Sequence, residues 1–180
     1  HLDGVNISPP VSDAMPLIEE LERRKIPFVR IAPGIARGST LSVAIDDVAA
    51  GRELTEYLIG LGHRAIAFVK GPPNHISSEE RHQGYRDALD AHGVAYDPDL
   101  VVQGDYSFAS GRKAAESLLA RTDPPTAIFA GNDDMAAGAL AVAHERDIVV
   151  PDALSIAGFD DTDLARAVWP PLTTIHQPIR

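Results

Sequence analysis

Residues 61–71 read Leu-Gly-His-Arg-Ala-Ile-Ala-Phe-Val-Lys-Gly, and this stretch decides the fold class. Its centre, Ala65–Val69, is a continuous apolar run rather than an alternation of apolar and polar residues. Such runs are typical of strands in a parallel sheet, because helices cover both faces of that sheet. The glycines before the run are typical of a helix end. The stretch therefore predicts a buried strand that follows a helix.

The same pattern continues along the whole chain. Short runs rich in β-branched and other apolar residues predict strands at Gly4–Ile7, Pro27–Ile31, Ser42–Ile45, Ala65–Val69, Leu100–Val102, Ala127–Ala130, Leu154–Ala157 and Thr173–His176. The segments between them carry apolar residues at helical spacing, as Tyr85, Ala88 and Leu89 do. Alternation of strands and helices predicts right-handed βαβ units. The predicted fold class is α/β, a doubly wound parallel sheet.

Polar residues mark the expected helix starts. Asp13 stands ahead of Pro16, Ser77 pairs with Glu80 as a capping box, and Asn132 precedes the helix that begins Asp-Asp-Met.

Composition excludes several classes of protein. The 180 residues are 44% hydrophobic, as in an ordinary soluble domain, and no apolar run approaches the ~20 residues of a membrane span. The chain lacks cysteine, which is consistent with a reducing cytoplasm, and its N-terminus does not resemble a signal peptide. Sixteen Lys and Arg against 26 Asp and Glu leave a net charge of −10. Because such a surface repels phosphate backbones, we do not expect this chain itself to contact DNA or RNA.

Polar side chains follow four of the predicted strands. In an open parallel sheet, ligands lie outside the carboxyl ends of the strands. The groups found there are Lys70 and then Arg81, Gln103 to Tyr106, Asn132 to Asp134, and Asp160 with Asp161. Carboxylates, amides, a guanidinium and an aromatic ring suit a polyol or a heterocycle. The sequence therefore predicts a site for a small polar ligand.

Each of these residues also has a purely structural interpretation. Asn132 is a good helix N-cap, and Arg81 can pair with Glu80 or face solvent. Tyr106 can belong to the core, and Asp160 can begin a turn. These alternatives remain open at this point.

The surrounding sequence does not support the motifs for catalysis and cofactor binding that this chain contains. Gly60 to Ala65 matches the dinucleotide pattern G-x-G-x-x-A, but these glycines lead from a helix into a strand, the reverse of what pyrophosphate binding requires. The paired aspartates at 133–134 and 160–161 lack the phosphate loop that magnesium-dependent phosphoryl chemistry needs. The histidines have no metal-ligand spacing. We expect no enzyme activity, no metal and no cofactor.

Taken together and in order, the strand-end motifs resemble the effector-binding core of the LacI/GalR family of bacterial transcription regulators. The motifs are residues 3–5 (Asp-Gly-Val), 61–68 (Leu-Gly-His-Arg-Ala-Ile-Ala-Phe), 80–89 (Glu-Arg-x-x-Gly-Tyr-Arg-x-Ala-Leu), 104–107 (Gly-Asp-Tyr-Ser), 125–129 (Pro-Thr-Ala-Ile-Phe), 132–138 (Asn-Asp-x-Met-Ala-x-Gly), 150–155 (Val-Pro-Asp-x-Leu-Ser), 158–161 (Gly-Phe-Asp-Asp) and 171–178 (Pro-Leu-Thr-Thr-Ile-His-Gln-Pro).

The resemblance implies a fold of the periplasmic-binding-protein-like type I, with a small-molecule effector in the cleft between two lobes. By motif match, Arg81, Tyr106, Asn132 and Asp160 fall at effector-contacting positions, and Asp46 falls at a crossover position that can also contact the effector. The effector is expected to be a sugar, with a purine as the alternative. The family also implies a cytoplasmic homodimer that binds operator DNA through an N-terminal helix-turn-helix.

The resemblance further implies a domain organisation. Residues 1–38 are expected to be an incomplete first lobe, 39–177 a complete second lobe, and 178–180 the start of a crossover back to the first lobe. The DNA-binding head is absent from this sequence, so we expect this chain to sense the effector and to dimerise for a regulator of the repressor type. The alternative is a periplasmic sugar-binding protein of an ABC transporter, which shares the fold.

Overall fold

The computed structural model describes residues 3–34 and 40–178, and it divides the chain into two compact units. The first unit comprises residues 1–46 and 74–77, and the second comprises residues 47–73 and 78–180. The predicted lobe boundary between residues 38 and 39 lies outside the described residues, as do residues 179–180 of the predicted crossover. Each unit is described by itself.

The first unit is a small parallel sheet with one α-helix. Strands β1 (Val5–Ile7), β2 (Phe28–Ile31) and β3 (Ser42–Val43) lie in the order β1-β2-β3. A short 3-10 helix, η1 (Val11–Asp13), precedes helix α1 (Met15–Arg23). The core of this unit is built from Ile7, Ile18 and Leu21.

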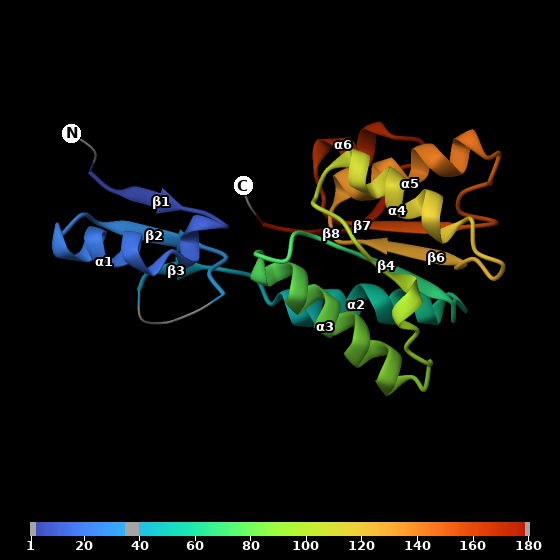
Figure 1. Ribbon diagram of the computed structural model, residues 1–180, viewed down its shortest axis with the longest axis horizontal. Helices are drawn as coiled ribbons and strands as arrows, with labels where there is room; N and C mark the ends of the chain where they lie inside the picture. The colour runs from blue at the N-terminus through green and yellow to red at the C-terminus, as the bar shows by residue number, and fades with distance from the viewer. Residues whose placement is uncertain (1–2, 35–39, 179–180) are drawn as a thin grey trace. The chain divides into compact units, whose positions relative to one another are not determined.

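The second unit contains a five-stranded parallel sheet. The strands are β4 (Ile66–Lys70), β5 (Val101–Gln103), β6 (Ala127–Ala130), β7 (Ser155–Asp160) and β8 (Thr173–His176), in the order β5-β4-β6-β7-β8. Helices α2 (Asp47–Gly60) and α3 (Ile76–Ala91) lie on one face of this sheet, and α4 (Phe108–Leu118), α5 (Asp133–Glu145) and α6 (Asp163–Ala167) lie on the other (Figure 1). A 3-10 helix, η2 (Pro98–Leu100), leads into β5.

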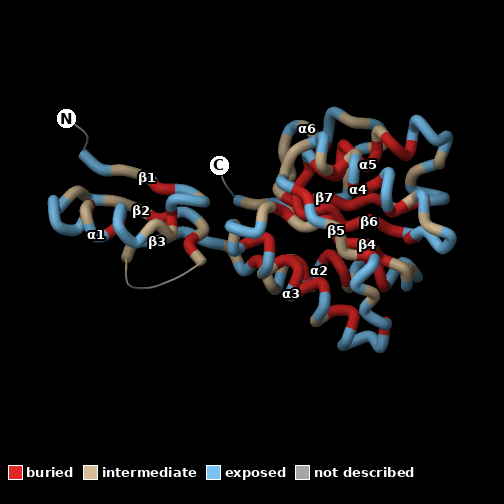
Figure 2. Tube along the Cα trace, viewed as in Figure 1, coloured by how far each residue is buried: buried red, intermediate tan, exposed pale blue. Residues whose placement is uncertain are grey.

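The buried residues of this unit lie where helices cover the two faces of the sheet. The central strands β4, β6 and β7 are coloured as buried along most of their length in Figure 2. On one face, Ala67, Ile128 and neighbouring residues pack against α4 and α5. The ring of Phe68 stacks on Tyr85 of α3 and meets the ring of Phe129 edge-on. The central strands have continuously apolar sequences because helices cover both faces of the sheet.

Glycines allow the helices on each face to cross closely. A Cβ added at Gly84 of α3 would lie 2.1 Å from the carbonyl oxygen of Val48 in α2. A Cβ added at Gly111 of α4 would lie 2.1 Å from the carbonyl oxygen of Met135 in α5. Neither distance is possible for a real side chain, so each helix pair requires glycine at its crossing. These two crossings position α3, which carries Arg81, and α5, which Asn132 caps.

The predicted α/β fold with parallel sheets is confirmed, and most predicted strands agree with the structure within one or two residues. Two helix-start predictions are wrong. Helix α1 begins after Ala14, and the Asp13 carboxylate instead accepts hydrogen bonds from Arg30 and from the backbone N–H of Gly34. Helix α3 has already begun at Ile76, so Ser77 lies inside it and does not form a capping box.

Strand β7 is longer than predicted. The glycine at 158 reads as the end of a strand, yet pairing with β8 continues as far as Asp160 opposite His176. Among the described residues, none of the helices combines the length and the apolar character needed to cross a membrane.

Candidate functional site

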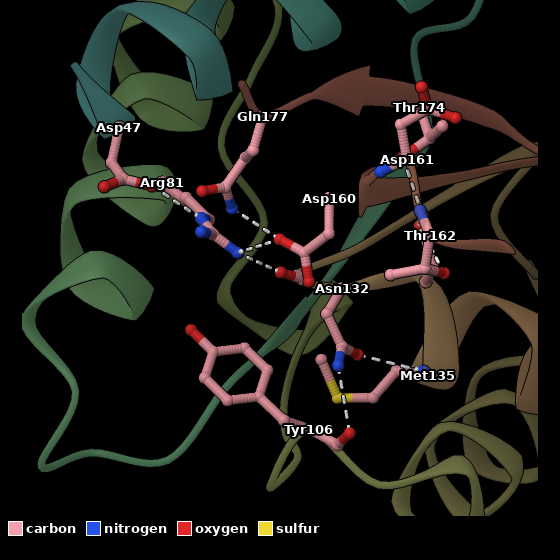
Figure 3. A network of polar contacts seen from close by, with 12 residues as sticks. Asp47, Arg81, Tyr106, Asn132, Met135, Asp160, Asp161, Thr162, Thr174 and Gln177 are labelled. Atoms are coloured by element: carbon pink, nitrogen blue, oxygen red, sulfur yellow. Dashed lines mark hydrogen bonds and ion pairs between the residues drawn. The ribbon is translucent and has the colours of Figure 1, made fainter. Parts of the chain in front are cut away.

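The carboxyl ends of the strands in the second unit bring polar side chains from separate segments together (Figure 3). The strand order reverses at β4, because β5 lies on one side of it and β6 on the other. The connections after β4 and β6 therefore run in opposite directions, which opens a crevice at this point in doubly wound sheets. The residues at this edge are called the strand-end network below: Asp47, Arg81, Tyr106, Asn132, Asp133, Asp160 and Gln177.

Arg81 lies at the centre of this network and is only 6% exposed. Its Nε donates to Oδ1 of Asp47 at 2.8 Å, and its Nη1 donates to the carbonyl oxygen of Gly131 at 2.6 Å. The guanidinium carbon lies 3.6 Å from the centre of the Phe159 ring, which is a cation–π contact. These contacts come from α2, β6 and β7, so the guanidinium is held in one orientation before any ligand arrives.

Asp160 ends β7 and faces Arg81. Its Oδ1 accepts a hydrogen bond from Nε2 of Gln177 at 2.5 Å and lies 3.7 Å from Nη1 of Arg81. Its backbone has a φ of 113°, a conformation that side-chain-bearing residues rarely adopt. Burial raises the pKa of Asp160 to about 6, since the partial compensation by Arg81 is offset by the negative charge of Asp133. Strained backbone and a raised carboxyl pKa are typical of functional positions.

Asn132 is the N-cap of α5. Its Oδ1 accepts from the backbone N–H of Met135 at 3.0 Å, and its Nδ2 donates to the carbonyl oxygen of Tyr106 at 3.0 Å. The predicted cap is thus confirmed, and the same side chain also ties the connection after β5 to the one after β6. The cap places the N-terminus of α5, with its partial positive charge, at the strand-end edge.

Tyr106 follows β5 and its backbone has a φ of 68°. Its ring fills the space over Gly71, where an added Cβ would lie 2.1 Å from the ring carbon Cζ. Glycine after β4 is therefore required for the ring to pack there. The aromatic face predicted for a ligand ring is present at this edge, in the position that Figure 3 shows.

Asp46, the fifth predicted ligand contact, belongs to the first unit and is exposed. Its neighbour Asp47 is the carboxylate that pairs with Arg81, and it is only 2% exposed. The sequence reasoning selected the first of two adjacent aspartates, whereas the strand-end network contains the second.

Two further members of the network, Gln177 and Asp133, were not predicted as ligand contacts, although Asp133 belongs to the polar run that follows the predicted strand Ala127–Ala130. Gln177 follows β8, so the rule applied to the other strand ends would have found it had it been extended to Thr173–His176. Asp133 is fully buried: its Oδ2 accepts from the N–H and the hydroxyl of Thr162 at 2.8 and 3.0 Å, and its Oδ1 accepts from the hydroxyl of Thr174 at 2.6 Å. Asp133 thereby links α5, β8 and the loop that follows Asp160.

The network offers hydrogen bonding rather than a nucleophile with a base. The serine–histidine contact of this unit lies at the start of β7, at the opposite edge of the sheet: His63 Nε2 is 2.9 Å from Ser155 Oγ, and its Nδ1 is 2.9 Å from Thr126 Oγ1. Burial lowers the pKa of His63, and its ring links the starts of three strands through Ser155 and Thr126. Within the described residues, no group of three or more His, Asp or Glu side chains is arranged to hold a metal ion.

Surface hollows elsewhere do not coincide with the strand-end network. One of about 510 Å³ is lined by residues of α3 and the following loop, including Arg86, Asp90 and Tyr96. Another of about 450 Å³ lies in the first unit around Lys25 and Phe28. Neither includes a residue of the strand-end network, so the site rests on strand-end chemistry and not on cavity size.

Comparison with known proteins decides the family. The profile of the family described as "Periplasmic binding protein-like domain" matches residues 55–180, which is most of the chain. The chain belongs to this family. The chain is also 42% identical over 168 residues to the HTH-type transcriptional regulator DegA of Bacillus subtilis, covering 93% of this chain and 50% of that protein. These relationships confirm the predicted LacI/GalR resemblance.

Solved structures agree. A regulatory protein of the LacI family from Chloroflexus aggregans superposes with a TM-score of 0.89 at 34% identity, covering 98% of this chain and 63% of that one. The complex of the transcriptional regulator CelR with cellobiose also has a TM-score of 0.89, at 37% identity, covering 99% of this chain and 55% of that one. This chain spans about half the length of the curated relatives it matches. Those relatives are HTH-type transcriptional regulators.

Proposed function

We propose that this chain is the effector-sensing and dimerising part of a LacI-type transcription regulator. The observation that carries the proposal is the strand-end network. Arg81, Asn132 and Asp160 come from three separate segments and meet at the edge where ligands bind in this type of sheet. All three were predicted from the sequence as effector contacts, together with Tyr106, and membership of the family supports that role.

The effector is a sugar. Arg81 and Asn132 supply donors, Asp160 supplies acceptors for adjacent hydroxyls, and Tyr106 supplies a face for the ring. Three or four charge-assisted hydrogen bonds at roughly 1.5–3 kcal/mol each are enough for micromolar binding. The structure of the relative CelR was determined with cellobiose, which makes that disaccharide a reasonable first probe. A purine is the second candidate, because amide and carboxylate groups also match the edges of a base.

The proposed arrangement of lobes, dimer and DNA-binding head is the one implied by the family. Residues 1–38 contribute to a first lobe, 39–177 form the second lobe, and 178–180 begin a crossover between them. The regulator acts in the cytoplasm as a homodimer and represses transcription by binding operator DNA through a helix-turn-helix outside this sequence. Asp46, at the crossover, contacts the effector from its own unit. Effector binding favours one arrangement of the dimer, and the change in operator affinity cannot exceed the difference in effector affinity between the two states.

A thermal-shift screen of neutral sugars and nucleobases tests the effector. A ligand that binds only the native state must raise the melting temperature. Arg81→Ala and Asp160→Ala should each abolish the shift, while Arg112→Ala, which removes a surface ion pair with Glu145, should leave it unchanged. Retained binding in both site variants would show that the effector lies elsewhere.

A titration of operator DNA tests the regulatory role. The full-length protein should change its affinity for operator DNA when the sugar identified in the screen is added. A protein that binds the sugar but does not respond at the operator would instead support the transport alternative, a periplasmic sugar-binding protein. The relatives found by sequence are regulators, so they do not favour that alternative.

A further inference from the structure

The charges of the strand-end network restrict which sugars the site accepts, and this inference rests on the sugar-sensing function proposed above. Three carboxylates accompany one guanidinium at this edge: Asp47 at the start of α2, Asp133 at the start of α5, and Asp160 at the end of β7. Asp47 Oδ1 lies 2.8 Å and Asp160 Oδ1 3.7 Å from nitrogens of Arg81. The three carboxylates and the single guanidinium of Arg81 together leave a net negative charge at this edge of the sheet.

The charge of Asp133 is satisfied by neutral groups. Its carboxylate accepts one backbone N–H and two hydroxyl hydrogen bonds, from Thr162 and Thr174. These donors stabilise the ionised form without cancelling its charge. The consequence is visible at Asp160, on which the negative charge of Asp133 acts.

The other cations next to the strand ends have carboxylate partners of their own. Lys70, at the end of β4, pairs with Glu79 at 2.5 Å. Arg166 of α6 pairs with Asp161 at 2.7 Å. Neither of these ion pairs therefore adds net positive charge at this edge, and the chain as a whole carries a net charge of −10.

The guanidinium of Arg81 already donates two of its five N–H groups to partners within the protein. A carboxylate or phosphate is normally gripped by two parallel N–H groups, either Nε with one Nη or the two Nη nitrogens together. In this structure Nε donates to Asp47 and Nη1 donates to the carbonyl oxygen of Gly131. Each of the two paired edges thus contains a nitrogen that already donates. An anion gripped through Nε and Nη2 would have to displace the bond to Asp47, whereas Nη1 keeps a second N–H besides the one that donates to Gly131.

We propose that the strand-end network selects uncharged sugars and rejects sugar phosphates and sugar acids. A neutral sugar donates its hydroxyls to Asp160 and takes a single hydrogen bond from Arg81, so it gains from both charges. An anionic derivative meets two carboxylates that Arg81 does not neutralise, at short range and in a site partly shielded from water.

A panel of matched ligands on the full chain tests the selection. Glucose, galactose and cellobiose are compared with glucose 6-phosphate, galacturonate and cellobionate by thermal shift and by calorimetric titration. The sugar that binds should do so at least about tenfold more tightly than its anionic counterpart, and the difference should shrink at high salt, because charge repulsion is screened.

Two variants test whether the carboxylates of the network cause the selection against anionic sugars. Asp47→Asn removes one negative charge but keeps an amide oxygen that can accept from Nε of Arg81, so the ratio of neutral to anionic affinity should fall several-fold. Asp134→Asn is the matched control, because Asp134 is an exposed carboxylate next to Asp133 on the same helix, and its loss should leave the ratio unchanged. If Asp47→Asn does not fold, the panel on the unmodified chain decides the question by itself.

The outcomes separate this inference from the function on which it rests. Binding of the neutral member alone supports the proposed selection. Equal or tighter binding of the phosphate or the acid overturns it and leaves sugar sensing intact. No binding by any member of the panel overturns the sugar-sensing function, and the selection with it.

Discussion

The two units of this chain achieve burial in different ways. The second unit has a sheet covered on both faces, and its central strands β4, β6 and β7 are almost fully buried. Among its described residues, the first unit buries three apolar side chains in its core, while Leu41 and Val43 remain 74% and 65% exposed. Its largest fully buried side chain is Arg30, which donates to the carbonyl oxygen of Ser12 and to Asp13.

This difference shows where a ligand site can be built. A sheet with a thick apolar core holds its strand ends rigidly, and the side chains at those ends are fixed further by hydrogen bonds to one another. Charged groups are then available for a ligand. In the first unit, the buried charge is used to hold the unit itself together.

The largest effect is expected from the core of the second unit. Phe129→Ala removes a fully buried ring that packs on Phe68, and it should lower the free energy of unfolding by about 3–5 kcal/mol. Urea denaturation followed by circular dichroism measures this. Phe108→Ala, at a ring that is 42% exposed, should change the free energy by less than about 1 kcal/mol. Equal effects of the two variants would contradict the view that one dominant core supports the second unit.

The next effect concerns the first unit. Arg30→Met keeps the apolar part of the side chain but removes the charge that pairs with Asp13 at 2.7 Å. Breaking a fully buried pair costs about 3–5 kcal/mol, and we expect about 2–3 kcal/mol here because Asp13 is more than a quarter exposed.

Hydrogen exchange resolves that loss by segment. Protection should fall in β1 and β2 and remain unchanged in β6. Arg23→Met, at an exposed ion pair with Glu20, serves as the control and should change nothing measurable. Loss of protection in β6 with Arg30→Met would mean that the two units do not differ in the way described above.

The pH dependence of effector binding tests the electrostatics of the strand ends. The pKa of Asp160 is raised to about 6 by burial and by Asp133, against the opposing effects of Arg81 and Gln177, with Asp47 raising it slightly. Its native pKa exceeds the unfolded value of 3.8, so the native state binds more protons in this window, and this contribution to stability declines as the pH rises from about 4 to 6.

Effector hydroxyls need the ionised carboxylate as an acceptor, so affinity should change in the opposite direction. It should fall as the pH drops below about 6, by up to about tenfold per pH unit. Titration calorimetry between pH 5 and 8 measures this, and Asp160→Asn should flatten the profile. An unchanged affinity from pH 8 to 5 in the unmodified protein would show that Asp160 does not receive the hydroxyls.

The smallest effect separates capping from ligand binding. Asn132→Ala removes the N-cap of α5 and should cost about 1 kcal/mol of stability, and it should also weaken effector binding. Ser107 caps α4 in the same way, through a hydrogen bond from the backbone N–H of Ser110, so Ser107→Ala should cost about the same stability and leave binding unchanged. Equal binding by both variants would leave Asn132 with its structural role alone.

Much of the fold could be predicted because its causes are local. The strands at Ala127–Ala130 and Thr173–His176 match the prediction residue for residue, the first because it is a continuous apolar run and the second because it is rich in β-branched residues. The Asn132 cap follows from one polar residue in front of a helical pattern. The Asp13 cap was predicted by the same rule and is wrong, because Arg30 comes close only in the folded first unit and takes that carboxylate as its partner.

The sequence by itself determined the parallel α/β class, the negative charge, and the strand ends at which Arg81, Tyr106, Asn132 and Asp160 occur. Only the tertiary structure decided that Asp47 rather than Asp46 meets Arg81, and that Asp133 and Gln177 act on Asp160. The physical reason is the separation along the sequence between the residues that interact. Helix and strand patterns depend on neighbours within a few residues, whereas the Arg81–Asp47 pair joins residues 34 positions apart, and their approach depends on how α2 and α3 cross.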